Sequence, residues 1–315
     1  MATVSFQLVP PAITSPGISR NEAAVLAGLA YSDLFDFPVT RREMARFAPF
    51  APMTPAEVSA AVDSLIARGT VRAHGPYVFL AGRADTIIAR RNREATSRAA
   101  WRQARRWAGV VWALPFVRMV AVTGSLAAGS MISGQDIDFL IVVNPGRLWT
   151  TRALCLLTWR MARIFGTRLC PNYLITSNAL SIRQINLYTA REFVQMKPLH
   201  GRGTAERLSR ANQWTVAFLP NARLDVDLAS DDLSPVARLF KRAAETCLRG
   251  SLWDRLEAWE RRRKIAQLTR EVGASTECEF TADVCKHHSN AHGQRILGHY
   301  RERLLEVVPS AVVFL

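Results

Sequence analysis

The stretch VTGSLAAGSMISGQDIDFLIVV, residues 122–143, places two aspartates at the start of an apolar run. A β-prone run at 116–122 leads into it, and 136–143 continues as a second predicted strand. Because side chains alternate along a strand, Asp136 and Asp138 point to one face, about 7 Å apart. Two carboxylates so placed repel each other when they are partly buried. The chain must therefore fold around this pair in a way that offsets the repulsion.

A bound divalent cation would remove that conflict. Carboxylate oxygens on a rigid strand are hard ligands, which Mg²⁺ prefers. The preceding turn contains Thr123, Gly124 and Ser125, and glycine lets the backbone come close to a ligand. A spacer of 10 residues, 126–135, then separates Ser125 from Asp136. A glycine turn beside such ligands suits magnesium carrying a nucleoside triphosphate.

This pattern resembles the nucleotidyltransferases of the DNA-polymerase-beta superfamily. Their signature is a hydrophobic strand, Gly-Ser, a spacer and Asp-x-Asp on the next strand, which stand here as VAVTGS and DIDFLIV. The resemblance implies an α/β (α+β) fold with a small mixed-sheet core. It implies that Thr123, Gly124 and Ser125 hold the triphosphate, while Asp136 and Asp138 bind Mg²⁺ or Mn²⁺ and are catalytic. The implied reaction moves a nucleoside monophosphate to a hydroxyl of a small molecule, a protein or an RNA end.

One feature departs from the family pattern. Active members usually carry a third carboxylate on a later strand, but the next predicted strand, 169–175, has no acid. Its only amide is Asn172, which we assign to the cofactor-binding site although an amide cannot act as a base. Glu192, in a predicted helix, is the nearest later acid. The alternative function is a catalytically weak or inactive nucleotide-sensing or DNA-binding regulator.

The segment 19–82 has a winged-helix-like pattern of three short helices and a hairpin. Capping-box signatures at Thr40 and Thr54 mark two of the helix starts. A helix that reads DNA should carry Arg, Lys, Asn or Gln on its outer face. The outer face of this third helix instead carries Glu57 and Asp63. We therefore favour a docking or substrate-presenting module over a DNA reader.

The net charge is +15, from 41 basic and 26 acidic residues. Such an excess attracts polyanions, although an arginine-rich proteome would also produce it. Eight arginines gather in 83–106, which is predicted to be a connecting helix. This helix has either a solvated arginine face or a ridge that binds nucleic acid without sequence preference.

The remaining segments complete a three-part organisation. We expect a poorly ordered tail over 1–18, a nucleotidyltransferase core over 107–222 and a helical C-terminal region over 223–315. The last region should begin with one long helix at about 233–270. The stretch DVCKHHSNAH, 283–292, offers zinc ligands, but it lacks a second cysteine pair and an HExxH motif.

Cysteine usage and hydropathy predict the compartment. The five cysteines form no CxxC pair, and the start of the chain has no signal-peptide pattern, so we expect reduced thiols in the cytoplasm. The longest apolar stretch, 107–122, is interrupted by Pro115 and Arg118. A membrane span needs about 20 apolar residues, so no membrane partner is expected.

Overall fold

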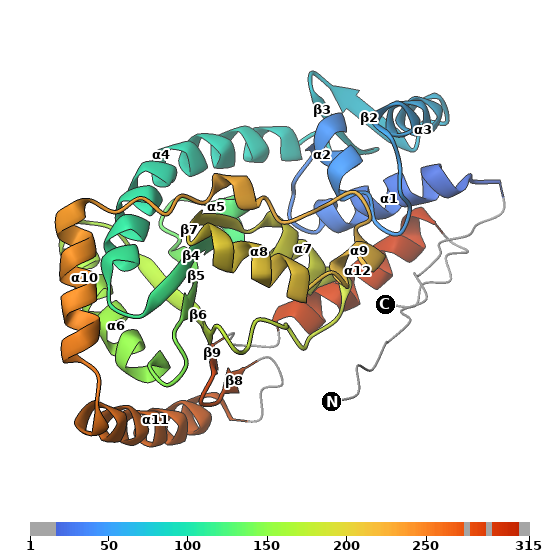
Figure 1. Cartoon of the computed structure of the whole chain (residues 1–315). Coiled ribbons are helices and arrows are strands. Elements are labelled where there is room, and N and C mark those ends of the chain that lie inside the picture. The colour runs from blue at the N-terminus through green and yellow to red at the C-terminus, as the bar shows by residue number, and fades with distance from the viewer. Residues whose placement is uncertain (1–16, 274–277, 288–291, 309–315) are drawn as a thin grey trace.

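The computed structural model describes residues 17–273, 278–287 and 292–308. A six-stranded mixed sheet, in the order β7-β4-β5-β6-β9-β8, forms the centre of the molecule (Figure 1). Its strands are β4 (Val117–Thr123), β5 (Ile137–Val143), β6 (Leu169–Thr176), β7 (Lys197–His200), β8 (Glu279–Phe280) and β9 (Val284–Lys286). Neighbours pair antiparallel except β5 and β6, which are parallel. The predicted mixed α/β class is confirmed, and the three predicted central strands lie within one residue of their expected bounds.

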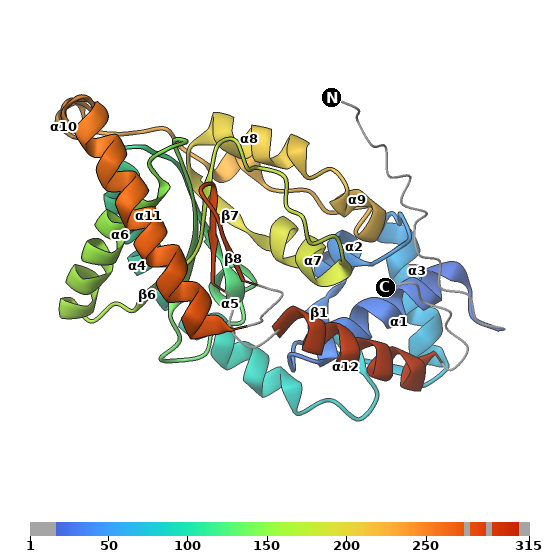
Figure 2. The same ribbon diagram turned by 90° about the horizontal axis from the view of Figure 1, so that it is seen from below.

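Alternate residues of the central strands face two separate apolar layers. On β4, Val120 and Val122 join the layer under α4 (Thr86–Ala113) and α6 (Leu148–Ile164). Met119 and Ala121 join the opposite layer with α7 (Leu187–Gln195) and α8 (Arg202–Ala211). Figure 2 shows the sheet between α6 on one side and α7 and α8 on the other. Burial on both faces explains why these strands are continuous apolar runs. The short elements α5 (Gly124–Ala127), α9 (Thr215–Phe218) and η1 (Val226–Leu228) connect these parts.

The N-terminal unit has three helices and a three-stranded sheet in the order β1-β3-β2. Its elements are α1 (Arg20–Asp33), β1 (Val39–Thr40), α2 (Arg41–Phe47), α3 (Pro55–Ala67), β2 (Val71–His74) and β3 (Tyr77–Leu80). The predicted capping boxes at Thr40 and Thr54 and the predicted hairpin are confirmed. Helix α1 packs against α12 (His292–Val307), where the rings of Tyr31 and Tyr300 lie 5.5 Å apart and Arg303 pairs with Asp33 at 2.8 Å.

Helix α4 runs without interruption to Ala113, so the expected boundary between 106 and 107 falls inside a helix. Part of its arginine content is structural. Arg90 is buried, pairs with Glu43 at 2.7 Å and with Glu94 at 2.6 Å, and so fastens α4 to α2. Five other arginines of this segment are exposed, namely Arg91, Arg98, Arg102, Arg105 and Arg106.

The prediction of one long helix at 233–270 is wrong. Two helices, α10 (Pro235–Cys247) and α11 (Ser251–Val272), meet at Gly250. This residue has φ +102°, a conformation that side chains with a Cβ rarely adopt, and it ends helical continuity. The two helices lie at the periphery, far from the N-terminal unit (Figure 1).

Several expectations fall partly or wholly outside the described residues. Of the tail expected at 1–18, residues 1–16 lie outside the described part of the structure. Residues 309–315 of the expected helical C-terminal region and His288, one of the candidate zinc ligands in 283–292, also lie outside it. The described parts of that segment form β9 and the start of α12. In the described ranges, no helix combines the length and the apolar character that a bilayer span requires.

Candidate active site

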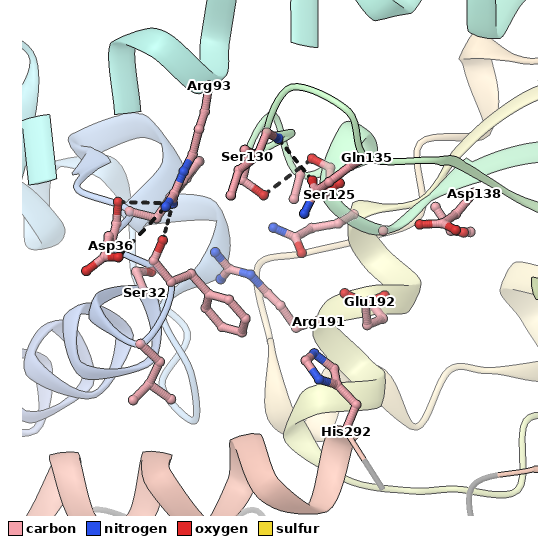
Figure 3. Close-up of a pocket in the computed structure, with 18 of the residues that line it drawn as sticks. Ser32, Asp36, Arg93, Ser125, Ser130, Gln135, Asp138, Arg191, Glu192 and His292 are labelled. Atoms are coloured by element: carbon pink, nitrogen blue, oxygen red, sulfur yellow. Dashed lines mark hydrogen bonds and ion pairs between the residues drawn. The ribbon is translucent and has the colours of Figure 1, made fainter. Parts of the chain in front are cut away.

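A cavity of about 720 Å³ lies between the N-terminal unit, the turn after β4 and helix α7 (Figure 3). It is lined by five of the six predicted site residues: Thr123, Gly124, Ser125, Asp136 and Asp138. The sixth, Asn172, lies on β6, but its side chain is outside the part of the structure that is described. Residues spread over the turn and two strands are thus brought to one space.

The glycine of the turn is required by the approach of an aspartate. Thr123 at the end of β4 is the antiparallel partner of Asp138 on β5, so the next residue, Gly124, lies directly over this carboxylate. A Cβ on Gly124 would lie 2.5 Å from Asp138 Oδ2, far inside contact distance, and its φ of +64° also favours glycine. The Gly-Ser and Asp-x-Asp parts of the sequence pattern are therefore one packed unit.

The two aspartates have different surroundings. Asp136 lies one residue before β5 and pairs with the Arg168 guanidinium at 2.8 Å. Asp138 lies inside the sheet, opposite Cys170 of β6. Burial and the two nearby aspartates raise the pKa of the Cys170 thiol to about 12. Negative charge thus accumulates at this corner of the sheet, and Arg168 pairs with its outer member, Asp136.

Glu192 adds a third carboxylate, from α7 rather than from a strand. It lines the same cavity as Asp138 (Figure 3). Burial, followed by the charges of Glu192 and Asp136, raises the pKa of Asp138 to about 7. Burial likewise raises the pKa of Glu192 to about 7, although Lys286 and Arg191 oppose the shift. Both groups therefore change charge near neutral pH.

Sequence reasoning placed Glu192 only as the nearest later acid and sought the third carboxylate on the strand of Asn172. The helical pattern gives a local signal for Arg191 but none for Glu192. Arg191 shares the buried face of α7 with Leu187, Ala190 and Val194, whereas Glu192 lies on the opposite side of the helix. Charged residues on such a buried face rarely occur without a specific partner or a function.

The N-terminal unit supplies one wall of the cavity, from Tyr31 to Phe37. Arg93 of α4 holds this wall by donating a hydrogen bond to the carbonyl of Phe35 and pairing with Asp36 at 3.8 Å. Arg191 is buried beside this wall and donates a hydrogen bond to the backbone carbonyl of Phe47 at 3.3 Å. Its guanidinium carbon also lies 3.9 Å from the centre of the Phe47 ring. Burial lowers the pKa of Arg191 to about 10.

The fit of a metal ion can be judged from these groups. Among the described residues, no three Asp, Glu, His or Cys side chains are grouped closely enough to hold a metal by themselves. Asp136 and Asp138 nevertheless supply hard oxygens, and a cation would offset the burial and the charge repulsion that raise the pKa of Asp138. Mg²⁺ typically takes only one or two carboxylates and completes its shell with water and substrate phosphates. The donor set fits an ion that arrives with a triphosphate.

Comparisons of this chain with protein-family models, with curated proteins and with solved structures find no match.

Proposed function

We propose that the protein is a nucleotidyltransferase that uses Mg²⁺ or Mn²⁺ to move a nucleoside monophosphate from a triphosphate to a hydroxyl. The observation that carries this proposal is the meeting of the Gly124–Ser125 turn, the Asp136/Asp138 pair and Glu192 in one cavity of about 720 Å³. That volume lies within the usual range for small-molecule sites, about 300–1,000 Å³. The strand order and the antiparallel β4–β5 pair also suit a polymerase-beta-like core, and the N-terminal unit suits a winged helix.

Each group has a role that follows from its position. The Gly124 turn lets phosphate oxygens approach the backbone, while Asp136 and Asp138 would hold the cation, which neutralises charge on the phosphates. The acceptor oxygen attacks the α-phosphorus and a new P–O bond forms. The bond from this phosphorus to the oxygen bridging the α- and β-phosphates breaks, and pyrophosphate leaves. The hydroxyl proton passes to Glu192, whose pKa of about 7 suits a general base near neutral pH.

A thermal-shift experiment tests the site. ATP with Mg²⁺ should raise the melting temperature, whereas ATP alone should not. Asp136→Asn combined with Asp138→Asn should abolish the shift. The chain contains a matched control, because Asp225 and Asp227 form a second Asp-x-Asp that does not line the cavity. Asp225→Asn with Asp227→Asn should keep the shift, and an equal shift in both double variants would remove the assignment.

A second candidate is a nucleotide sensor that binds but does not transfer. The Asp136–Arg168 pair favours it, because one of the two proposed metal ligands already has a cationic partner. Incubation with α-³²P-labelled triphosphates, Mg²⁺ and a cell extract separates the two. An enzyme transfers label, and Glu192→Gln slows transfer by about 10²–10⁴-fold without changing the nucleotide-induced thermal shift. A sensor gives the thermal shift and no labelled product with either protein.

The N-terminal unit is better explained as part of the site than as a DNA reader. Its helix α3 presents exposed Glu57 and Asp63, and Asp63 pairs with Arg41 at 2.5 Å. The unit also contributes the wall from Tyr31 to Phe37. We infer that any contact with nucleic acid uses the exposed arginines of α4, lacks sequence preference and weakens steeply with salt.

A further inference from the structure

A second cavity, of about 230 Å³, adjoins the first. Thr123, Tyr188 and Glu192 line both cavities, so the two spaces meet at these side chains. Glu192 therefore faces the proposed nucleotide site on one side and a separate, smaller space on the other. The proposed reaction needs an acceptor hydroxyl at this junction.

The smaller cavity has an apolar floor and a polar end. Leu140 of β5, Phe193 of α7 and Met196, which directly follows α7, provide apolar surface. At the polar end, the ammonium group of Lys286 on β9 donates a hydrogen bond to Gln184 Oε1 at 2.5 Å. Among the described residues that line this cavity, Lys286 is the only one with a positive charge.

Its size limits the occupant. At about 30 Å³ for each water in the liquid, the space corresponds to roughly eight waters. It is also below the range of about 300–1,000 Å³ that is usual for drug-sized ligands. A molecule of about ten non-hydrogen atoms fits, whereas a whole nucleotide or a folded protein segment does not.

We propose that this cavity binds the acceptor, a small hydroxylated molecule with one anionic group. The inference rests on the proposed function. The anionic group pairs with Lys286, and the hydroxyl lies toward Glu192 at the junction. The hydroxyl oxygen then bonds to the α-phosphorus of the nucleotide in the larger cavity, pyrophosphate leaves, and the proton moves to the Glu192 carboxylate. The product is the acceptor carrying a nucleoside monophosphate.

Binding of simple probes tests the cavity without knowledge of the natural acceptor. Glycerol 3-phosphate and lactate serve as hydroxylated anions, and glycerol serves as the uncharged counterpart. The measurements are made with Mg²⁺ and α,β-methylene ATP present, which fills the larger cavity and cannot be cleaved at that bond. We expect at least one anion to bind, measured by calorimetry, and glycerol to bind at least tenfold more weakly.

Two lysine variants locate the binding. Lys286→Gln should weaken binding of the anion at least tenfold and leave the thermal shift by Mg²⁺ and ATP unchanged. Lys264→Gln is the matched control, because Lys264 also donates to a glutamine, Gln267, at 2.9 Å but lies on α11.

Three results would overturn the acceptor site: no anion binds, glycerol binds as well as the anions, or Lys286→Gln binds them unchanged. These results leave the proposed function standing as long as Mg²⁺ and ATP still stabilise the wild type. Loss of that stabilisation in the wild type would instead overturn the proposed function itself. A Lys286→Gln protein that lacks the ATP shift would show a general defect, and binding would then be repeated with Lys286→Arg, which keeps the charge and should keep binding.

Discussion

Two regions of the molecule bury carboxylates, and they treat them in opposite ways. Where α10 and α11 meet the core, Glu245 accepts from Phe116 N–H at 2.8 Å, and Glu257 accepts from Trp149 N–H at 2.9 Å. Burial raises the pKa of Glu245, but hydrogen bonds from Arg118 and Phe116 outweigh it and the net shift is downward. In the cavity, burial and neighbouring acids raise the pKa of Asp138 instead.

The contrast separates acids that stabilise the fold from acids that we propose to be functional. A carboxylate surrounded by donors stabilises the fold in its ionised form. A buried carboxylate whose charge is opposed by other carboxylates is held at a cost in stability, which is a common property of functional sites. Substitutions in the two regions should therefore have opposite effects on stability.

The largest expected effect is on activity, in Asp138→Asn. Transfer of labelled nucleotide should fall by about 10²–10³-fold, because the variant lacks a carboxylate that would hold the cation, and loss of one electrostatic stabilising group costs roughly 3–4 kcal/mol in comparable sites. In the absence of nucleotide and metal at pH 8, the same variant should be more stable by about 1–3 kcal/mol, measured by urea unfolding. A variant less stable than the wild type would show that Asp138 belongs with the structural acids.

The next largest effect is on stability, in Glu257→Ala. This change leaves the N–H groups of Trp149 and Thr150 at the start of α6 without their acceptor, so unfolding free energy should fall by about 3 kcal/mol. Glu271→Ala is the control, because Glu271 is exposed on the same helix. It should change stability by less than about 0.5 kcal/mol. Equal effects at both positions would break the comparison.

The pH dependence of stability gives a further test of the contrast between the two regions. Asp138 and Glu192 have ordinary pKa values of 3.8 and 4.5 when unfolded and about 7 when folded. The folded protein therefore holds protons that the unfolded chain releases, and the contribution of these groups to stability falls as pH rises from about 4 to 7. Asp138→Asn with Glu192→Gln should remove this trend. The stability gap between this variant and the wild type should widen up to pH 7 and then stay constant.

Glu245 should show the opposite sign. Its pKa is lowered in the fold, so its contribution is complete above the unfolded value of 4.5 and is lost as pH falls below it. Urea unfolding of Glu245→Gln across the same pH range would test this. The variant should lose its disadvantage relative to the wild type under acidic conditions, and a disadvantage that grows on acidification would contradict the assignment.

The smallest expected effect concerns the outer face of α10. Val236, Leu239 and Phe240 are each at least 68% exposed, while Lys241 and Glu245 of the same helix are buried. The ammonium group of Lys241 donates to the carbonyls of Trp112 and Val117. Leu239→Ser should therefore change the unfolding free energy by no more than about 0.5 kcal/mol. A loss of 2 kcal/mol or more would mean that this face is covered in solution.

Local signals in the sequence were sufficient for some of this architecture. The capping box at Thr54 joins residues three apart, and the hairpin after it pairs residues three to nine apart; both were predicted. The positions of Gly124 in a turn and of Asp138 on the following strand were also predicted, because these two elements are consecutive in the chain. These features need no knowledge of distant contacts.

The rest depends on contacts between segments far apart in the sequence. Glu192 reaches the cavity from a helix 54 positions after Asp138, so a search along the next strand could not find it. Helix α10 carries the apolar residues Val236, Leu239 and Phe240 at helical spacing, yet this side of the helix is exposed. Its orientation is set by Lys241 and Glu245, which satisfy backbone groups near Phe116 more than 120 residues earlier.

The packing of α1 against α12 has a consequence for how the protein is made. The cavity is lined by residues from Tyr31 to His292, so the wall formed by the N-terminal unit is synthesised about 260 residues before helix α12, which completes the cavity. At translation rates of about 5–20 residues per second, the delay is roughly 10–50 s. During that time the apolar side of α1 that contacts Tyr300 lacks its final cover. The nascent N-terminal unit should therefore be a chaperone substrate on the ribosome, and nucleotide binding should begin only after α12 emerges.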